Sequence, residues 1–208
     1  MSDRPDPRAH GSIEIVRAVP KRLPALAGVL GRALASDPIF QCALGGSGTV
    51  EAISDMACTL YERATEAGMV WEGGDGAGVA VWVPPGGAGL LGAADQIEAR
   101  HTSVGSVDDG SRQQMWDWLE SYVTADVWYL EVLGVDPARQ RKGVGSALTH
   151  HGLRRAAASG TAAFLETSVA TNVPYYERFG FEVVEEGDAP NGGPHVWFMR
   201  CEPRADLS

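Results

Sequence analysis

The sequence predicts one domain of the α/β (α+β) class, built as a mixed central sheet with helices on both faces. Segments with an apolar period of two alternate along the chain with segments of helical spacing, as β-α-α-β-β and later β-α-β-α-β-β. No internal repeat and no linker-like stretch divides the 208 residues. We therefore expect a single domain over residues 12–203, with a disordered lead-in at 1–11 and a flexible end at 204–208.

Four element predictions cover the N-terminal half. Alternating apolar residues predict a strand over 13–19, and leucines at helical spacing predict a helix over 23–34, closed by the Asp37-Pro38 pair. A second helix is expected over 49–67. Strands over 69–71 and 79–83 flank a glycine-rich segment, which indicates a hairpin rather than a phosphate loop. Two further helices, separated by a polar break near 103–111, are expected within 90–122.

The C-terminal half begins with an apolar run over 127–135, as expected for a buried central strand. The run contains one charged residue, Glu131, which period-two geometry places on the same face as Tyr129, Leu133 and Val135. The following elements are expected in this order: a helix over 143–159, a strand over 162–167, a short helix over 173–178, and strands over 181–185 and 195–201.

Composition excludes several classes of protein. A formal net charge of −10 argues against a nucleic-acid partner and suits a cationic acceptor, although acidity can also serve solubility alone. No apolar stretch reaches the roughly 20 residues that span a bilayer, and the first residues lack a signal peptide, so we expect no membrane partner and a cytoplasmic location. Three widely spaced cysteines predict neither a disulfide framework nor a metal site. A monomer and a homodimer both remain open.

An anion site is predicted where the central strand turns into the next helix. The first turn of a helix leaves about four N–H groups without intrahelical partners, and its dipole favours a negative charge there. Gly143 and Gly145 let phosphate oxygens approach the backbone, while Arg141 and Lys142 add positive charge to an acidic protein. Neither a Walker loop nor a GxGxxG fingerprint fits, because Gly145 is followed by Ser146-Ala147 and position 148 is leucine.

Two motifs resemble those of the GCN5-related N-acetyltransferase (GNAT) superfamily. Its Gln/Arg-x-x-Gly-x-Gly/Ala signature matches residues 140–145, and its second signature resembles residues 172–181. Segments 79–82, 164–168 and 193–197 are most similar to the branch of puromycin N-acetyltransferases. The resemblance implies the GNAT fold, a mostly antiparallel sheet whose two central strands splay apart.

The resemblance also implies the cosubstrate and the site. Acetyl-CoA would be bound by Leu133, Val135, Gln140, Arg141, Lys142, Gly143, Val144, Gly145, Ser146 and Asn172. Tyr176 stands where the family places a tyrosine that protonates the departing thiolate, although it can instead serve packing alone. Trp82, His195 and Trp197 are candidates for the border of the acceptor pocket.

Glu131 is a candidate general base, since burial would raise its pKa toward the working range. A structural ion pair is the alternative role for this carboxylate, and a chain of water molecules is the alternative base.

The predicted function is acetyl-CoA-dependent N-acetylation of a small-molecule amine, with an aminonucleoside antibiotic such as puromycin as the candidate acceptor and antibiotic resistance as the role. Segments 36–47 and 90–124 depart from the puromycin branch where acceptor contacts are expected, so the acceptor remains open. The alternatives are acetylation of protein N-termini or lysines, and a non-catalytic module that binds acyl-CoA or a drug.

Overall fold

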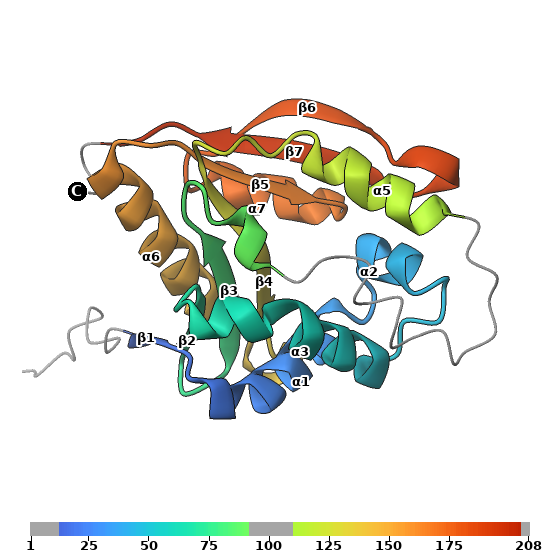
Figure 1. Ribbon diagram of the computed structural model, residues 1–208. Helices are drawn as coiled ribbons and strands as arrows, with labels where there is room; N and C mark the ends of the chain where they lie inside the picture. The colour runs from blue at the N-terminus through green and yellow to red at the C-terminus, as the bar shows by residue number, and fades with distance from the viewer. Residues whose placement is uncertain (1–12, 92–109, 205–208) are drawn as a thin grey trace, which may run out of the picture.

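A computed structural model describes residues 13–91 and 110–204, in which seven strands form one sheet in the order β1-β2-β3-β4-β5-β7-β6 (Figure 1). Every neighbouring pair is antiparallel except β4 and β5, which run parallel. This arrangement confirms the predicted mixed, mostly antiparallel sheet. The strands are β1 (Ile15–Arg17), β2 (Val70–Gly73), β3 (Gly78–Val83), β4 (Trp128–Val135), β5 (Ala163–Thr167), β6 (Glu182–Asp188) and β7 (His195–Cys201).

Helices cover both faces of the sheet, as predicted (Figure 1). One apolar core lies between one face and α1, α3 and α5, and a second core lies between the opposite face and α6 and α7. The helices are α1 (Leu23–Leu34), α2 (Pro38–Ala43), α3 (Val50–Glu66), α5 (Ser111–Glu120), α6 (Val144–Ser159) and α7 (Val173–Glu177). Short 3-10 turns occupy 20–22, 88–90, 137–139, 170–172 and 190–192.

The two parallel strands at the centre of the sheet separate soon after they meet. Residues 128–129 of β4 pair with residues 163–164 of β5, and no further pairs follow although β4 continues to Val135 and β5 to Thr167. The predicted splay of the central strands is therefore present. It leaves an opening in the middle of the sheet between the C-terminal parts of the two strands.

A β-bulge in β4 changes which face its side chains occupy. Its register with β3 passes from Leu130 directly to Val132, so Glu131 is an extra residue without a partner on β3. Tyr129 packs in the core under α1 and α3, whereas Leu133 and Val135 pack on the α6 side. The expectation that Glu131 shares a face with Leu133 and Val135 was therefore wrong, because the bulge breaks the period of two.

The structure also corrects several element boundaries. The helix α2 was not predicted, because the Asp37-Pro38 pair was interpreted only as the end of α1. Asp37 instead caps α2, accepting hydrogen bonds from the N–H groups of Ile39 (2.9 Å) and Phe40 (3.4 Å). Strand β6 extends three residues beyond its expected end at 185. Residues 1–11, most of 204–208 and the first of the two helices expected within 90–122 lie outside the described residues.

Trp82 positions α6 against the sheet. Its side chain is fully buried, its Nε1 donates to the carbonyl of Leu148 (3.2 Å), and its ring lies against the Cα of Gly152 in α6. A residue without solvent-exposed surface cannot contact an acceptor, so the prediction that Trp82 borders the acceptor pocket was wrong.

We expect Gly152→Ala to destabilise the protein by about 1–3 kcal/mol, because the new Cβ would overlap the rigid indole of Trp82. Gly28→Ala in α1 is the matched control. A Cβ there meets only the flexible end of Arg32 at 3.5 Å, so stability should rise slightly, as for other helical Gly-to-Ala changes. Chemical denaturation of both variants measures the difference. Equal stability would show that α6 does not depend on this close contact.

Candidate functional site

Two cavities meet where β4 and β5 separate. The first, of about 520 Å³, lies beside the start of α6 and α7. The second, of about 80 Å³, lies on the opposite side, beneath α2 and α3. Leu133, Asn172 and Tyr176 line both cavities, so the two cavities are neighbours at these residues.

The first cavity gathers the residues predicted to bind the cosubstrate. All of them line it except Lys142, which is exposed outside it. Tyr175 and Arg178 also line this cavity and were not predicted. Arg178 lies over the ring of Tyr175 at 5.1 Å, which brings a second arginine to the cavity besides Arg141.

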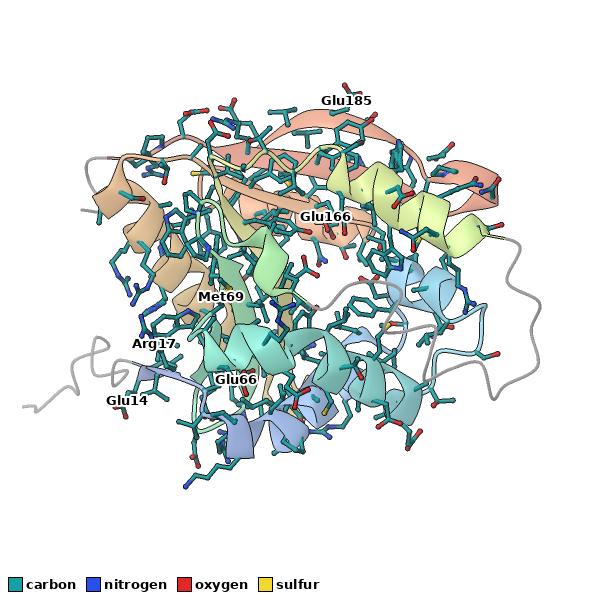
Figure 2. All side chains as sticks on the ribbon, in the orientation of Figure 1. Glu14, Arg17, Glu66, Met69, Glu166 and Glu185 are labelled. Atoms are coloured by element: carbon teal, nitrogen blue, oxygen red, sulfur yellow. The ribbon has the colours of Figure 1, made fainter. Side chains whose placement is uncertain are left out.

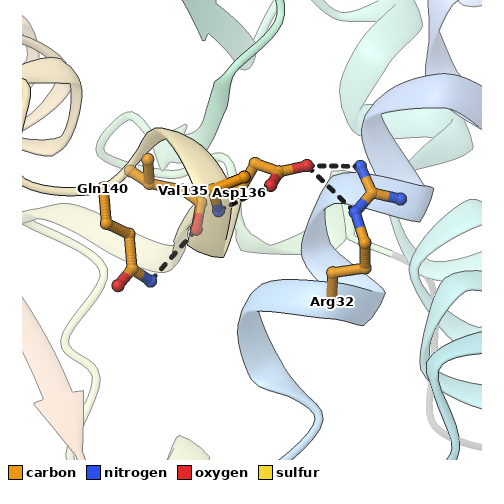
Figure 3. A network of polar contacts seen from close by, with 5 residues as sticks. Arg32, Val135, Asp136 and Gln140 are labelled. Atoms are coloured by element: carbon orange, nitrogen blue, oxygen red, sulfur yellow. Dashed lines mark hydrogen bonds and ion pairs between the residues drawn. The ribbon is translucent and has the colours of Figure 1, made fainter.

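A network of polar contacts fixes the turn from β4 into this loop (Figure 3). Asp136 accepts from the Nε (2.9 Å) and a terminal nitrogen (2.7 Å) of Arg32, and from the N–H of Ala138 (3.0 Å). The side-chain amide of Gln140 donates to the carbonyl of Val135 at 3.2 Å. The shape of the turn thus depends on its own side chains and on Arg32 of α1.

The loop fits a pyrophosphate. Gly143 caps α6 with a φ of 83°, a conformation that glycine adopts without strain. The residues of the first helical turn line the cavity, and their N–H groups have no partner within the helix. Gly145 has an additional role, because a Cβ there would lie 3.0 Å from the Tyr175 hydroxyl. Free N–H groups, the helix dipole and two arginines together suit the diphosphate of an acyl-CoA.

The second cavity is acidic at its polar end and apolar along its wall. Segments that were expected to contact the acceptor reach it: α2, within 36–47, and α5, within 90–124. Three carboxylates line it, those of Asp37, Glu131 and Glu166. The apolar wall is formed by Leu34, Ile39, Phe40, Leu60 and Trp116.

The carboxylates of Glu131 and Glu166 are close enough to influence each other. The Tyr129 hydroxyl donates to Oε1 of Glu166 at 2.6 Å, and the Tyr61 hydroxyl makes a long contact of 3.5 Å with Oε1 of Glu131. Burial raises the pKa of Glu131 to about 7. Burial, and then the negative charge of Glu131, raises the pKa of Glu166 to about 8. Both carboxyls can therefore exchange protons near neutral pH.

Sequence reasoning missed Glu166, a half-buried residue of β5 that lines the second cavity and is labelled in Figure 2. The signal that identified Glu131, a charged residue inside an apolar strand, is also present at Glu166 in β5. Glu166 was considered only as part of the segment 164–168, for the resemblance of that segment to known sequences, and its charge was not considered. The face that Glu166 occupies depends on the pairing of β5, which is not visible in the sequence.

Tyr176 is the one tyrosine of the Tyr175-Tyr176 pair that lines both cavities. Burial, and then the neighbouring Tyr175 and Glu166, raise its pKa above the ordinary value, so its hydroxyl stays protonated. The Tyr175 hydroxyl lies instead 3.5 Å from Oγ1 of Thr149, beside α6. The two adjacent tyrosines therefore differ in the cavities that they line: Tyr175 lines only the first cavity, and Tyr176 lines both.

His195 and Trp197, the other acceptor candidates, lie on β7 and line neither of these two cavities. Nδ1 of His195 is 2.7 Å from Oδ1 of Asp188, and its ring packs on Trp197 with centroids 4.6 Å apart. Their contact with an acceptor stays a prediction.

Comparison with known proteins agrees with this geometry. A family model described as the acetyltransferase (GNAT) family matches residues 104–181. A Corynebacterium glutamicum structure described as histone acetyltransferase HPA2 and related acetyltransferase is 22% identical, with a TM-score of 0.65 over 93% of this chain and 97% of that one. Arylalkylamine N-acetyltransferase 2 of Aedes aegypti is 14% identical, with a TM-score of 0.61 over 92% and 99%. Polyamine N-acetyltransferase of Drosophila melanogaster is 14% identical, with a TM-score of 0.61 over 91% of this chain and 99% of that one.

The split sheet and the loop after β4 therefore define a GNAT fold, which the solved structures share. The family match covers residues 104–181, so over this part the chain is similar to the GNAT acetyltransferases. Similarity to the puromycin branch stays a prediction. Within the described residues, no helix is long and apolar enough to cross a membrane.

The raised pKa of Glu166 predicts how stability changes with pH. Because the folded state holds this proton up to about pH 8 while the unfolded chain releases it near 4.5, folding stability should fall as the pH rises between these values. Glu166→Gln removes this loss and keeps an oxygen that accepts from Tyr129. We expect the variant to be more stable than the wild type at pH 9, with the difference shrinking toward pH 4.

Thermal unfolding from pH 4 to 9 measures this prediction, with Glu185→Gln on the exposed strand β6 as the control. Parallel stability curves for the wild type and Glu166→Gln would contradict a raised pKa at Glu166.

Proposed function

We propose that this protein transfers the acetyl group of acetyl-CoA directly to the amine of a small cationic molecule, with residues 12–203 acting as one catalytic domain. The observation that carries the proposal is the junction of two chemically different cavities at Tyr176. One cavity has the N–H groups and arginines that suit a pyrophosphate, and the other has three carboxylates that suit an ammonium group.

The acyl donor would bind in the first cavity. The start of α6 and Arg141 would hold its pyrophosphate, and the opened edge of β4 at Leu133 and Val135 would bind the pantetheine arm, with Asn172 contacting the arm between the strands. The thioester supplies an activated acetyl group when bound. The Leu133 backbone N–H is the candidate that stabilises the developing oxyanion, since Leu133 lies at the junction of both cavities.

The acceptor would lose a proton to Glu131. A pKa near 7 lets this carboxylate accept the proton at neutral pH and release it after each turnover. The free lone pair of the amine then forms the C–N bond as the C–S bond breaks. Tyr176 lines both cavities and would donate its proton to the departing thiolate, and the second proton leaving the nitrogen would restore the phenol, giving free coenzyme A and an N-acetylated product.

The acceptor cavity also limits the size of what it can enclose. Its volume of about 80 Å³ is well below the several hundred Å³ of a drug-sized site, so it would hold a small amine or the amine end of a larger one. Puromycin is the candidate from sequence resemblance. Solved structures of similar fold include enzymes named for arylalkylamines, polyamines and agmatine, all of them small amines.

A free-thiol assay with acetyl-CoA tests the proposal. The acceptor panel should contain puromycin, other aminonucleosides, arylalkylamines, agmatine, polyamines, aminoglycosides and lysine-containing peptides. Thiol release with a small amine, together with the acetylated product in the mass spectrum, is the expected result. Release with peptides only would replace the proposal by protein acetylation. Binding of acetyl-CoA without release on any acceptor would favour a non-catalytic module.

We expect Tyr176→Phe to lower kcat by roughly 10²-fold, because the thiolate would lose its proton donor. Tyr175→Phe is the matched control, since that hydroxyl contacts Thr149 and does not reach the acceptor cavity. Steady-state kinetics of both variants with the acceptor from the panel give the comparison. Equal activity of Tyr176→Phe and the wild type would remove Tyr176 from the mechanism.

We expect Gly143→Asp to abolish acetyl-CoA binding, because it places a carboxylate where the pyrophosphate would lie. Gly160→Asp is the control for backbone strain, since Gly160 also has a positive φ (66°) but sits at the other end of α6 in open space. Calorimetric titration with acetyl-CoA measures both. Similar loss of affinity in the two variants would attribute the effect to strain and not to the loop.

A further inference from the structure

Glu166 has an oxygen without a partner in the acceptor cavity. Among the described residues, Oε2 of Glu166 is the one buried side-chain oxygen or nitrogen that lacks a hydrogen bond. The other carboxylate oxygen of Glu166, Oε1, accepts a short hydrogen bond from the Tyr129 hydroxyl. A buried acceptor left without a donor costs free energy, commonly 1–3 kcal/mol and more for a charged group. The cavity that it lines therefore lacks a hydrogen-bond donor that a ligand can bring.

The neighbouring groups hold Glu166 in place. Tyr129 lies between the two glutamates, and its pKa is raised well above the ordinary value by burial and by the charges of Glu131 and Glu166. Tyr129 therefore remains a donor and fixes the orientation of Glu166. When both carboxyls are deprotonated, which a bound cation would favour, Oε2 and the Glu131 carboxylate are two acceptors on adjoining strands that diverge around the cavity.

The third carboxylate in the cavity, that of Asp37, already has hydrogen-bond donors within the protein. Oδ1 of Asp37 accepts from two N–H groups of α2 and from the hydroxyl of Ser168 at 3.2 Å. Asp37 therefore acts as a helix cap and adds negative charge to the cavity. The other groups that titrate there are the phenols of Tyr61 and Tyr176, with Glu120 of α5 acting from a distance on Glu131.

The chemistry of the cavity selects one kind of ligand. A primary ammonium group has three N–H donors, enough for Glu131, for Oε2 of Glu166 and for one contact toward the acyl donor. A secondary ammonium group has two donors, and a hydroxyl has one and no charge. The wall between α2 and α5, with Phe40 and Trp116, suits an apolar or aromatic body.

We propose that Glu166 is the specificity-determining residue of the acceptor site, anchoring a primary alkylammonium group through Oε2 while Glu131 takes one of its protons. One N–H bond of the ammonium breaks, and its proton passes to the Glu131 carboxylate. The lone pair so released lies along the broken N–H bond, toward Glu131, and inversion or rotation at the nitrogen then turns it to the junction at Tyr176, while a second N–H donates to Glu166. As an account of acetyl transfer this rests on the proposed function, but the binding step can be measured without transfer.

Three probes that share a 2-phenylethyl group and differ only in their polar group test the proposal: 2-phenylethylamine, N-methyl-2-phenylethylamine and 2-phenylethanol. Calorimetric titrations use the full chain with coenzyme A present, so that the acceptor binds without reacting. We expect the primary amine to bind, the N-methyl amine to bind at least tenfold more weakly, and the alcohol to show no measurable binding.

The variant Glu166→Gln is expected to bind the primary amine about 10- to 100-fold more weakly, as for the loss of a charge-assisted hydrogen bond. Glu185→Gln on β6 is the control with unchanged binding. If Glu166→Gln fails to unfold cooperatively, Glu166→Asp replaces it, since the shorter side chain withdraws the carboxylate and should also weaken binding at least tenfold.

Three results would overturn the proposal: equal binding of the amine by Glu166→Gln and the wild type, equal binding of the amine and the alcohol, or no binding of any probe by the wild type. The thiol assay is read separately. Thiol release with an amine that Glu166 does not help to bind would keep the proposed function and reject this inference. Selective binding through Glu166 without acetyl transfer from acetyl-CoA would keep the inference and reject the proposed function.

Discussion

The separation of β4 from β5 is the constraint on which the rest of the site depends. Two parallel strands that pair over two positions leave later backbone groups and side chains without sheet partners. The first cavity opens on one side of this gap and the acidic second cavity on the other, with Leu133, Asn172 and Tyr176 lining both. A fully paired sheet would separate the two cavities by a continuous layer of backbone, so the direct transfer that we propose depends on the gap.

The bulge at Glu131 completes this arrangement by assigning opposite roles to nearby residues of one strand. It turns Glu131 toward Tyr61 and the second cavity, while Leu133 and Val135 pack on the side of α6, the helix that follows the loop after β4. In a regular strand these side chains would share a face. One extra residue therefore lets β4 contribute side chains to both cavities.

How far the sequence predicted this site depends on the range of the interactions involved. The loop at 140–145 and the order of the strands were predictable, because glycines, a helix start and apolar periodicity are local signals. The face of Glu131 and the role of Trp82 were not, because each depends on a partner far along the chain: β3 for the bulge and Gly152 for the indole. The role of Glu166 could not be predicted for the same reason, because only the pairing of β5 with β4 and β7 determines which cavity its side chain lines. The helix α2 did have a local signal, Asp37 as N-cap followed by Pro38, but this pair was interpreted only as the end of α1.

The same long-range contacts explain why two raised-pKa carboxylates are kept in a partly apolar cavity. Packing without function would favour apolar residues at both positions, since burying like charges near each other destabilises the fold. Tyr129 offsets part of this cost at Oε1 of Glu166 and leaves Oε2 without a donor. A cation bound there would relieve both the repulsion and the unmet hydrogen bond. In the proposed function, the destabilisation caused by these carboxylates is thus a source of affinity for an ammonium ligand, and it links the stability of this fold to the acceptor that the cavity would bind.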